Sequence, residues 1–486
     1  MVIDEVRTVY FIGIKGTGVC PLAELMHHAG YKVNGSDTHE EFYTDAILKK
    51  LNIHFHEKFD SKHITKDIDL VIYSAAYSAD SNPELTRVHE LGIPALKYTD
   101  ALGLWSQQFD STGICGVHGK TTTTAMCGVL IKALAIPAQV LVGSAVVDFD
   151  EMSTISLGDK YFIAETCEYR KHFMSFHPRR IILTSVESDH QDYFPDYESI
   201  RDAFVEYCRL LPPGGQLFYC IDDPGANEVA QIIQNDKRNI ELIPYGFTAS
   251  GDYRIVSYNV GDGEASFSLA GVNAGAEFKL GIPGRHEALN AAAAIALTLA
   301  LINDDKQNNC SLNAGQMQSV KNALANFKST KRRSEIIGET GGIIFMDDYG
   351  HHPTAIKTTL EGIKKFYSNR RLIVSFMSHT YTRTSSLLEE FSGCFNDADI
   401  VIFHKIYASA RESYGGTVNG YTLFEKSAAI RSAAQKGDTY YFEEYDDAFE
   451  PLCKMLKSGD LFMTLGAGNN WPLGRKLLKY FEGYHG

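Results

Sequence analysis

The segment STGICGVHGKTTTT, residues 111–124, decides the fold class of the chain around it. An apolar strand pattern leads into a glycine-rich turn, and a helical pattern follows from 122 to 134. Such a junction binds polyphosphate because backbone N–H groups converge there, glycines allow close approach and a lysine neutralises charge. The turn matches the shortened pattern GxxGK followed by Thr, since Ile114 stands where the longer pattern has its first glycine. The residues predicted to bind ATP are Gly116, His118, Gly119, Lys120, Thr121 and Thr122. A glycine turn with a solvated lysine is the alternative.

Strand and helix patterns also alternate before and after this segment, which predicts an α/β protein. The length of 486 residues suits about three domains. We expect a Rossmann-like N-terminal domain, a central P-loop ATPase domain with a mostly parallel sheet, and a Rossmann-like C-terminal domain, at 1–108, 109–328 and 329–486. Strand patterns lie at 31–37, 69–76, 161–165, 180–186, 342–348, 371–376, 399–404 and 460–466, with a β-rich stretch at about 215–282 and an alanine-rich helix after Gly284.

The composition is that of a folded enzyme, with 44% hydrophobic and 22% charged residues. A formal net charge of −14 argues against a nucleic-acid partner or an anionic membrane surface. The nine cysteines show no CxxC spacing, which favours a reducing compartment. The start is acidic, and the longest nearly apolar run, 291–302, is too short to cross a bilayer. We therefore expect a cytoplasmic protein without membrane insertion.

A second glycine turn, GIKGTG at 13–18, also follows a strand pattern. Asp37 ends the next strand pattern, where a carboxylate can hold a ribose hydroxyl. The order of the glycines is GxxGxG rather than GxGxxG, so the turn indicates a nucleotide-containing ligand without implying redox chemistry. A tight turn that binds nothing is the alternative.

Two further residues follow strands of the central domain. Glu165 ends one strand pattern and His190 follows the next, at the sheet edge where open α/β sheets bind ligands. Together with Thr121 they are candidates for a magnesium site. Because Mg²⁺ prefers oxygen ligands, a structural, hydrogen-bonding His190 is the alternative.

Later segments add polar residues whose roles the residue types leave open. Asn290 lies in a helix of small residues and can read an adenine edge, cap or pack. Arg332 and Arg333 form a basic pair that is either solvated or moves onto a phosphate when domains close. Asp348, His351, His352 and Arg383 fall in loops after strand patterns, where they are either site residues or surface.

The combination of motifs resembles the Mur ligase family over essentially the whole chain. The motifs, in order, are GIKGTG, NGSD, SAA, GVHGKTTTT, AE, SDH, PGRHEALNA, KRR, DDYGHHPT, TYTRT and LGAGN. DDYGHHPT and TYTRT are most similar to the branch that joins L-alanine to UDP-N-acetylmuramate. The resemblance implies that the N-terminal domain binds the UDP sugar, the central domain binds ATP and Mg²⁺, and the C-terminal domain binds the amino acid.

The resemblance also assigns residues. It implies that Lys120 and Thr121 hold the ATP phosphates and magnesium, with Glu165 and His190 at the metal, Asn290 at the adenine, Arg333 at the phosphates and Asp348 at the ribose. The residues implied at the amino acid are Tyr349, His352 and Arg383. Those implied at the UDP sugar are Gly13, Gly16, Thr17, Gly18, Ser36, Asp37 and Ser74. Lys120, Arg333, His352 and Arg383 are the expected catalytic residues.

Four positions depart from the family pattern. Val117 replaces a Thr in the phosphate loop, Cys167 an Asp and Glu287 an Asn, while Thr380 replaces an Arg and thereby weakens the assignment of L-alanine. No lysine occurs between Lys171 and Lys237, so the carbamylated lysine of sister ligases has no obvious counterpart, as expected for the alanine-adding branch.

The implied reaction is ATP-dependent amide formation through an acyl phosphate. A ligase that recycles a murein tripeptide onto the same UDP sugar is the alternative within the family. A nucleotide-dependent binding module, which uses ATP only to close its domains, is the alternative from another class.

Overall fold

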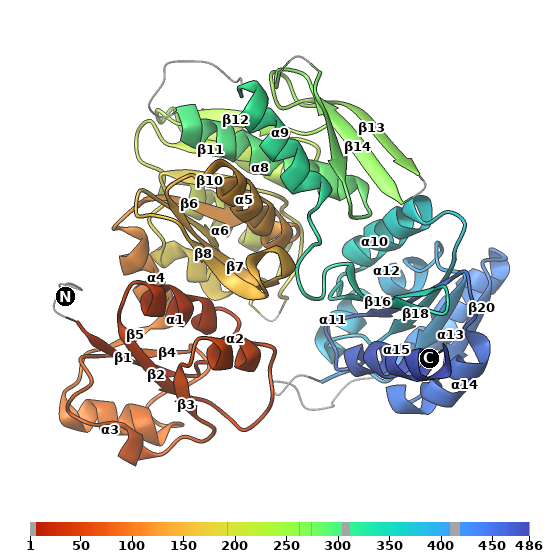
Figure 1. The fold of residues 1–486 in the computed structure, drawn as a ribbon, viewed down its shortest axis with the longest axis horizontal. Coiled ribbons are helices and arrows are strands. Elements are labelled where there is room, and N and C mark those ends of the chain that lie inside the picture. Colours follow the sequence, from red (N-terminus) through yellow and green to blue (C-terminus); the bar gives the residue numbers. More distant parts are fainter. Residues whose placement is uncertain are drawn as a thin grey trace.

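The computed structural model describes residues 6–191, 193–261, 263–273, 275–303, 312–408 and 418–485. Three large sheets, each with helices packed on its faces, follow one another along the chain (Figure 1). Most neighbouring strands within them run parallel, which confirms the predicted α/β class. The expected boundary at 108 falls between α4 (Tyr98–Ser106) and β6 (Asp110–Cys115). The boundary expected at 328 falls between α9 (Ala314–Ala325) and β16 (Glu335–Thr340), and both boundaries stay predictions.

The N-terminal sheet has five parallel strands in the order β3-β2-β1-β4-β5. Its elements are β1 (Thr8–Ile12), α1 (Val19–His28), β2 (Lys32–Ser36), α2 (Thr44–Lys50), β3 (His54–His56), β4 (Leu70–Tyr73), α3 (Pro83–Leu91), β5 (Ala95–Lys97) and α4. The glycine turn at 13–18 joins β1 to α1 at the carboxyl edge of this sheet.

The central sheet has the order β12-β11-β10-β6-β9-β7-β8, and only the β7–β8 pair is antiparallel. Its elements are β6, α5 (Lys120–Leu134), β7 (Ala138–Val146), β8 (Met152–Ser156), β9 (Tyr161–Glu165), β10 (Arg180–Leu183), α6 (Tyr197–Cys208), β11 (Gln216–Cys220), α7 (Pro224–Asn235) and β12 (Glu241–Tyr245). A three-stranded antiparallel sheet and two helices complete this region: β13 (Ile255–Gly261), β14 (Glu264–Leu269), β15 (Glu277–Leu280), α8 (Arg285–Asn303) and α9.

The stretch expected to be β-rich contains a helix, α7. The Asp223 side chain accepts from the Ala226 N–H at 2.7 Å, and Pro224 opens the helix. An Asp N-cap followed by Pro is a readable helix start, and its signal was present in the sequence. The alanine-rich α8 lies where it was expected, and it packs against α5. Among the described residues, α8 alone is long and apolar enough to cross a membrane, but 72% of that stretch is buried inside the protein.

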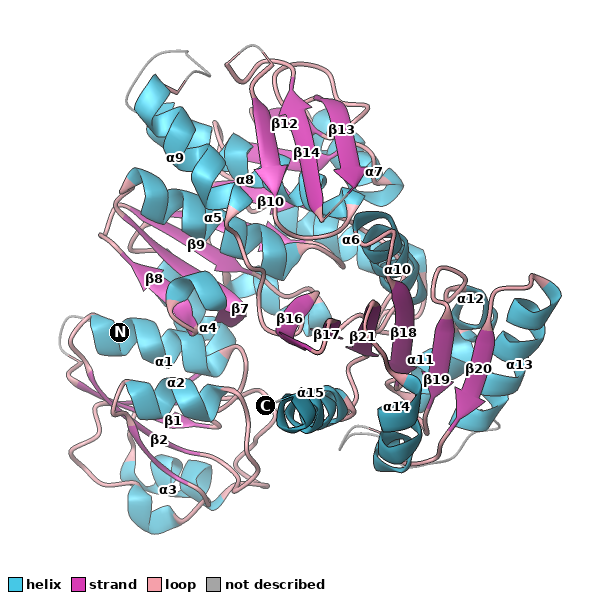
Figure 2. Cartoon of the chain, turned by 45° about the vertical axis from the view of Figure 1, so that its right-hand side comes forward, coloured by secondary structure: helices cyan, strands magenta, loops and turns pink. Residues whose placement is uncertain are grey.

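The C-terminal sheet has the order β16-β17-β21-β18-β19-β20, with β16 antiparallel to β17 (Figure 2). Its elements are β16, β17 (Ile343–Asp348), α10 (Pro353–Phe366), β18 (Arg371–Phe376), α11 (Tyr381–Ser386), α12 (Leu388–Gly393), β19 (Ile400–Phe403), α13 (Gly420–Ala433), β20 (Asp438–Tyr441), α14 (Phe449–Met455), β21 (Asp460–Leu465) and α15 (Trp471–His485). The expected C-terminal strands therefore all occur.

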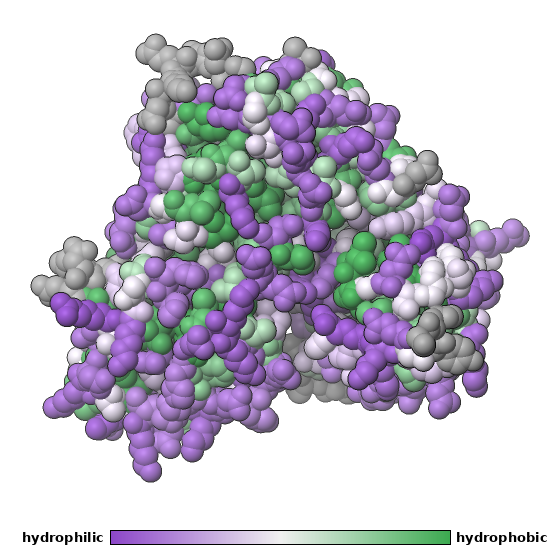
Figure 3. Space-filling model, in the orientation of Figure 1, coloured by the Kyte–Doolittle hydropathy of each residue, from purple (hydrophilic) through white to green (hydrophobic). Residues whose placement is uncertain are grey.

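The apolar cores are distributed unevenly among these regions. One continuous cluster joins α1 of the N-terminal region to the central sheet. The C-terminal sheet has separate clusters on its two faces, and Phe366 and Tyr367, at the end of α10, reach the large cluster. On the face seen in Figure 3, polar residues cover most of the surface and interrupt the apolar patches.

Candidate active site

The phosphate-loop candidate forms the turn between β6 and α5. Gly116 and Gly119 have φ of +136° and +82°, which L-residues with side chains rarely adopt. A Cβ on Gly119 would lie 2.8 Å from Asn290 Oδ1, and one on Gly116 would clash with Thr184. The turn therefore needs glycine at both positions for conformation and for space.

Lys120 begins α5 and forms an ion pair that the sequence did not reveal. Its Nζ lies 2.9 Å from Glu168 Oε2, and the Glu168 side chain is almost fully buried. Burial opposes charge on both groups, but their mutual attraction outweighs it: the pKa of Lys120 is raised and that of Glu168 is lowered. Both groups therefore stay ionised, and Glu168 positions the lysine beside the loop.

Two oxygen donors fit a magnesium ion. The Thr121 hydroxyl donates to Glu165 Oε1 at 3.0 Å, and Glu165 Oε2 accepts from the Gly143 N–H at 2.9 Å. Hydroxyl and carboxylate oxygens are ligands that Mg²⁺ accepts. His190 lies beside Glu168, with its Nε2 3.5 Å from Glu168 Oε1. The structure thus brings Thr121 and Glu165 together and places His190 beside the partner of Lys120.

A cavity of about 740 Å³ lies between the central and C-terminal regions. Predicted site residues that line it are His118, Gly119, Lys120, Thr121, Thr122, Glu165, Asn290, Arg333, Asp348 and His352. Predicted residues outside its lining are Gly116, His190, Tyr349, Arg383 and all those predicted for the UDP sugar. One cavity therefore joins the phosphate loop to residues more than 200 positions later in the chain.

Asn290 lies on the wall of this cavity, on α8. Its Nδ2 donates to Glu287 Oε2 at 2.9 Å, and its Oδ1 accepts from the Thr123 hydroxyl at 3.1 Å. The bond with Thr123 ties α8 to α5 behind the phosphate loop. The departure at Glu287 thus supplies a partner for Asn290, and the predicted adenine contact of Asn290 stays a prediction.

The basic pair divides between two roles. Arg332 Nε lies 3.0 Å from Asp347 Oδ2, so this arginine is bound within the C-terminal region. Arg333 faces the cavity and lies over the Tyr349 ring, 5.3 Å from its centroid. Asp348 Oδ2 accepts from the Ser334 N–H at 2.7 Å. Arg333 is therefore the member of the pair that is available to a ligand in the cavity.

Arg383 connects the C-terminal and central regions. Its Nη2 lies 2.9 Å from Asp189 Oδ1, and its Nη1 donates to the carbonyl of His379 at 2.9 Å. Burial opposes ionisation of Asp189, yet Arg383 holds the pKa of this carboxyl well below its usual value. His351 lies near this pair, and burial followed by the Arg383 charge lowers its pKa well below the ordinary value. Thr380 occupies the N-cap position of α11.

The N-terminal turn is separate from this cavity. Gly13 has a φ of +82°, and a Cβ there would lie 2.8 Å from the Tyr77 ring. The Lys15 N–H donates to Asp37 Oδ2 at 2.7 Å, so Asp37 supports the turn. The residues predicted for the UDP sugar lie at or just beyond the ends of β1, β2 and β4: Gly13, Gly16, Thr17, Gly18, Ser36, Asp37 and Ser74.

Comparison with known proteins identifies the family from three matching segments. Residues 8–110 match the Mur ligase family catalytic domain, residues 114–298 the Mur ligase middle domain, and residues 332–468 the Mur ligase glutamate ligase domain. The chain belongs to the Mur ligase family. A Mur ligase from Treponema pallidum, named UDP-N-acetylmuramate--L-alanine ligase, is 48% identical over 98% of this chain and 96% of its own length. A protein of the same name from Borreliella burgdorferi is 39% identical over 97% and 98%.

Solved Mur ligases share the fold. UDP-N-acetylmuramate-alanine ligase from Thermotoga maritima has a TM-score of 0.76 and 23% identity, covering 99% of this chain and 100% of its own. A murein peptide ligase from Psychrobacter arcticus has a TM-score of 0.66 and 22% identity, covering 98% of each chain. These similarities confirm the three-part α/β fold of the family.

Proposed function

We propose that this protein joins L-alanine to UDP-N-acetylmuramate with hydrolysis of ATP to ADP and phosphate, in the synthesis of peptidoglycan precursors. The observation that carries the proposal is the single cavity in which Lys120 and Thr121 face Arg333 and His352. The names of the full-length relatives favour this reaction over tripeptide recycling. Cytoplasmic action fits the cysteines of the described residues, which are all free.

The chemistry begins with a carboxylate, which is a poor acylating agent. The lactyl carboxylate attacks the γ-phosphorus of ATP, and ADP leaves, giving an acyl phosphate. Lys120, held charged by Glu168, and Arg333, which faces the cavity, stabilise the negative charge of the transferred group. Thr121 and Glu165 would hold Mg²⁺, which supplies additional positive charge to the phosphates when it is bound.

Amide formation then consumes the acyl phosphate. The amine of L-alanine attacks the acyl carbon, the bond to phosphate breaks and the amine loses a proton. His352 is the proposed acceptor, because burial lowers its pKa and keeps the imidazole neutral. Tyr349 and Arg383 are proposed to bind the amino acid close to His352, with Arg383 at its carboxylate.

The UDP sugar is proposed to bind at the N-terminal turn, with the other nucleotide contacts in the cavity. The residues proposed for ATP are Gly116, His118, Gly119, Thr122, Asn290 and Asp348, in addition to those already named. Because these groups belong to three regions, closure of the regions on one another is required to bring the carboxylate to the γ-phosphate.

Mass spectrometry of the reaction product tests the proposal. The purified protein is given UDP-N-acetylmuramate, ATP, Mg²⁺ and either L-alanine, another amino acid or the murein tripeptide. We expect an L-alanyl amide product with equimolar phosphate release. A tripeptide product instead would assign the recycling reaction, and nucleotide binding without any amide would assign a binding module.

A further inference from the structure

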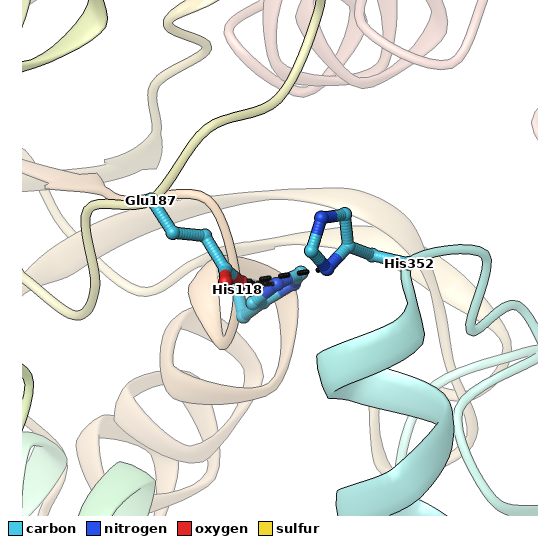
Figure 4. Close-up of side chains that lie close together, drawn as sticks. All are labelled: His118, Glu187 and His352. Carbon is cyan, nitrogen blue, oxygen red and sulfur yellow. Dashed lines mark ion pairs between the residues drawn. The ribbon is translucent and has the colours of Figure 1, made fainter. Parts of the chain in front are cut away.

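Three side chains meet at one edge of the cavity, where the central region approaches the C-terminal region: His118, Glu187 and His352. His118 comes from the phosphate loop, Glu187 from the loop after β10, and His352 from the N-cap of α10 (Figure 4). The Glu187 carboxylate pairs with the His118 imidazole, and its Oε1 lies 3.6 Å from His352 Nδ1. One ligand atom from each residue lies within 4.8 Å of the others. Glu187 was not singled out from the sequence.

His352 is buried without a hydrogen-bond partner. Its exposed fraction is 6%, and within the described part of the chain neither ring nitrogen has a hydrogen-bond partner. An unpaired buried polar group is costly, so its position indicates a ligand that the side chains alone do not supply. The ring is aimed at Glu187 and lies 5.3 Å from the ring of His118, centroid to centroid.

The backbone and a neighbouring hydroxyl hold the cluster in place. The His118 N–H donates to Ser185 Oγ at 2.8 Å, and Thr354 donates from the C-terminal side to Glu187 Oε2 at 3.1 Å. Glu187 Oε1 is thereby left facing the two imidazoles.

Two imidazoles and one carboxylate suit Zn²⁺ and similar transition-metal ions better than Mg²⁺, which prefers oxygen alone. We propose that His118, Glu187 and His352 form a Zn²⁺ site that bridges the central and C-terminal regions. The site is distinct from the Thr121 and Glu165 pair proposed for magnesium. A bound Zn²⁺ fixes the two regions relative to each other and withdraws His352 from the proposed proton transfer, so occupation of the site inhibits ligation. That inhibitory consequence rests on the proposed function, whereas the binding site does not.

The N-terminal region contains another group of imidazoles, which is an alternative place for Zn²⁺ to bind. The His56 and His63 rings stack at 3.6 Å, and the His54 ring lies 4.9 Å from that of His56. His56→Gln is therefore the matched control, because it removes an imidazole from a histidine cluster outside the cavity.

The experiment measures metal binding to the full chain directly. ZnCl₂ is titrated by calorimetry in excess Mg²⁺, without nucleotide, and CoCl₂ binding is followed by its visible absorption. We expect one site per chain that Mg²⁺ does not displace. Glu187→Gln and His352→Gln are each expected to weaken binding at least tenfold, in line with the 10-fold to 100-fold effects of groups around metal sites. His56→Gln is expected to bind as the unchanged protein does.

Thermal unfolding without metal checks that each variant is folded, and His352→Asn serves as a second variant if His352→Gln is not. Loss of binding in His56→Gln with retention in Glu187→Gln would overturn the proposal, as would full displacement by Mg²⁺ or the absence of any Zn²⁺ binding. Failure of ligation with every substrate would overturn the proposed function but would leave these binding results intact.

Discussion

The molecule contains two glycine turns of the same design, and they use their lysines differently. Both turns follow a strand and precede a helix. In the N-terminal turn, Lys15 is buried and its Nζ lies 2.9 Å from Asp45 Oδ1. In the central turn, Lys120 faces the cavity and pairs with Glu168 at the cavity edge. A lysine in a glycine turn is therefore not by itself evidence that its ammonium group binds phosphate.

The difference lies in what surrounds the lysine. Asp45 is itself buried, and the Lys15 ammonium also donates to the carbonyl of Glu40 at 3.0 Å. The Lys15 charge therefore holds the turn to α2. Lys120, in contrast, lines the cavity whose opposite wall comes from the C-terminal region. The location of the charge, which depends on residues distant in sequence, separates a structural lysine from one that can bind phosphate.

The largest effect is expected from loss of the Lys120 charge. Lys120→Ala should lower the rate of ligation at least about 10³-fold, or ~4 kcal/mol, because a donor to the transferred phosphoryl group is lost. Steady-state kinetics of phosphate release measures it. Since Glu168 then remains buried without its lysine, the double variant Lys120→Ala/Glu168→Gln should regain thermal stability but no activity. Near-normal turnover of Lys120→Ala would remove this turn from the active site.

Lys15 should affect folding more than turnover. Lys15→Met leaves the Asp45 carboxylate buried without a cation, which should lower the free energy of unfolding by about 3 kcal/mol. The matched double variant Lys15→Met/Asp45→Asn should recover most of that loss, as measured by denaturant unfolding. If Lys15→Met were as stable as the parent and lost UDP-sugar binding instead, the two lysines would play the same part.

Local sequence patterns predicted the elements whose formation depends mainly on their own residues. The C-terminal strands at 371–376 and 460–466, for example, are short, apolar and bounded by polar loops, and they occur as expected. The strands β7 and β8 were missed. Their pairing is antiparallel and lies at the edge of an otherwise parallel sheet, so it depends on tertiary context.

The site was predictable where one segment carries its own chemistry, as in the turn around Lys120. Glu168 and Glu187 were not, because an acidic residue in a loop carries no mark of the partner it will meet. Their partners are 48 residues away at Lys120 and 165 residues away at His352. His190 also lies beside Glu168 in the structure, and its assignment to the magnesium site stays a prediction.

The stability of the contact between the N-terminal and central regions should depend on pH. Glu24 on α1 accepts from the Ser153 N–H at 3.2 Å and the Thr154 N–H at 3.1 Å of β8, and burial raises its pKa from 4.5 to about 7. A folded-state pKa above the unfolded value means that protonation favours the folded form. This contribution is complete below about pH 4.5 and is lost as pH rises toward 7.

Glu24→Gln removes this titration while keeping an acceptor for the same N–H groups. The difference in free energy of unfolding between Glu24→Gln and the parent should therefore change by about 3 kcal/mol between pH 4.5 and pH 8, in favour of the variant at high pH. Chemical unfolding at a series of pH values measures it. Glu90→Gln, on the exposed side of α3, is the control and should show no such change. Parallel pH profiles for the parent and Glu24→Gln would mean that Glu24 is not protonated in the folded protein.

The smallest effect on catalysis is expected from substitution of Arg383. It tests whether the C-terminal region supplies a substrate contact to the site at the central turn, which the N-terminal turn does not have. Arg383 is held by Asp189 at 2.9 Å, and its guanidinium can bind a carboxylate through two N–H groups, which an ammonium cannot reproduce. Arg383→Lys should therefore raise the apparent KM for L-alanine about tenfold, or ~1.4 kcal/mol, and change the KM for ATP much less. Varying each substrate in turn measures the two constants.

Arg370→Lys is the matched control, because Arg370 pairs with Glu339 at the far end of the sheet, and it should leave both constants unchanged. An unchanged KM for L-alanine combined with a much higher KM for ATP would assign Arg383 to the nucleotide, and the C-terminal region would then serve the phosphate loop rather than the incoming amine.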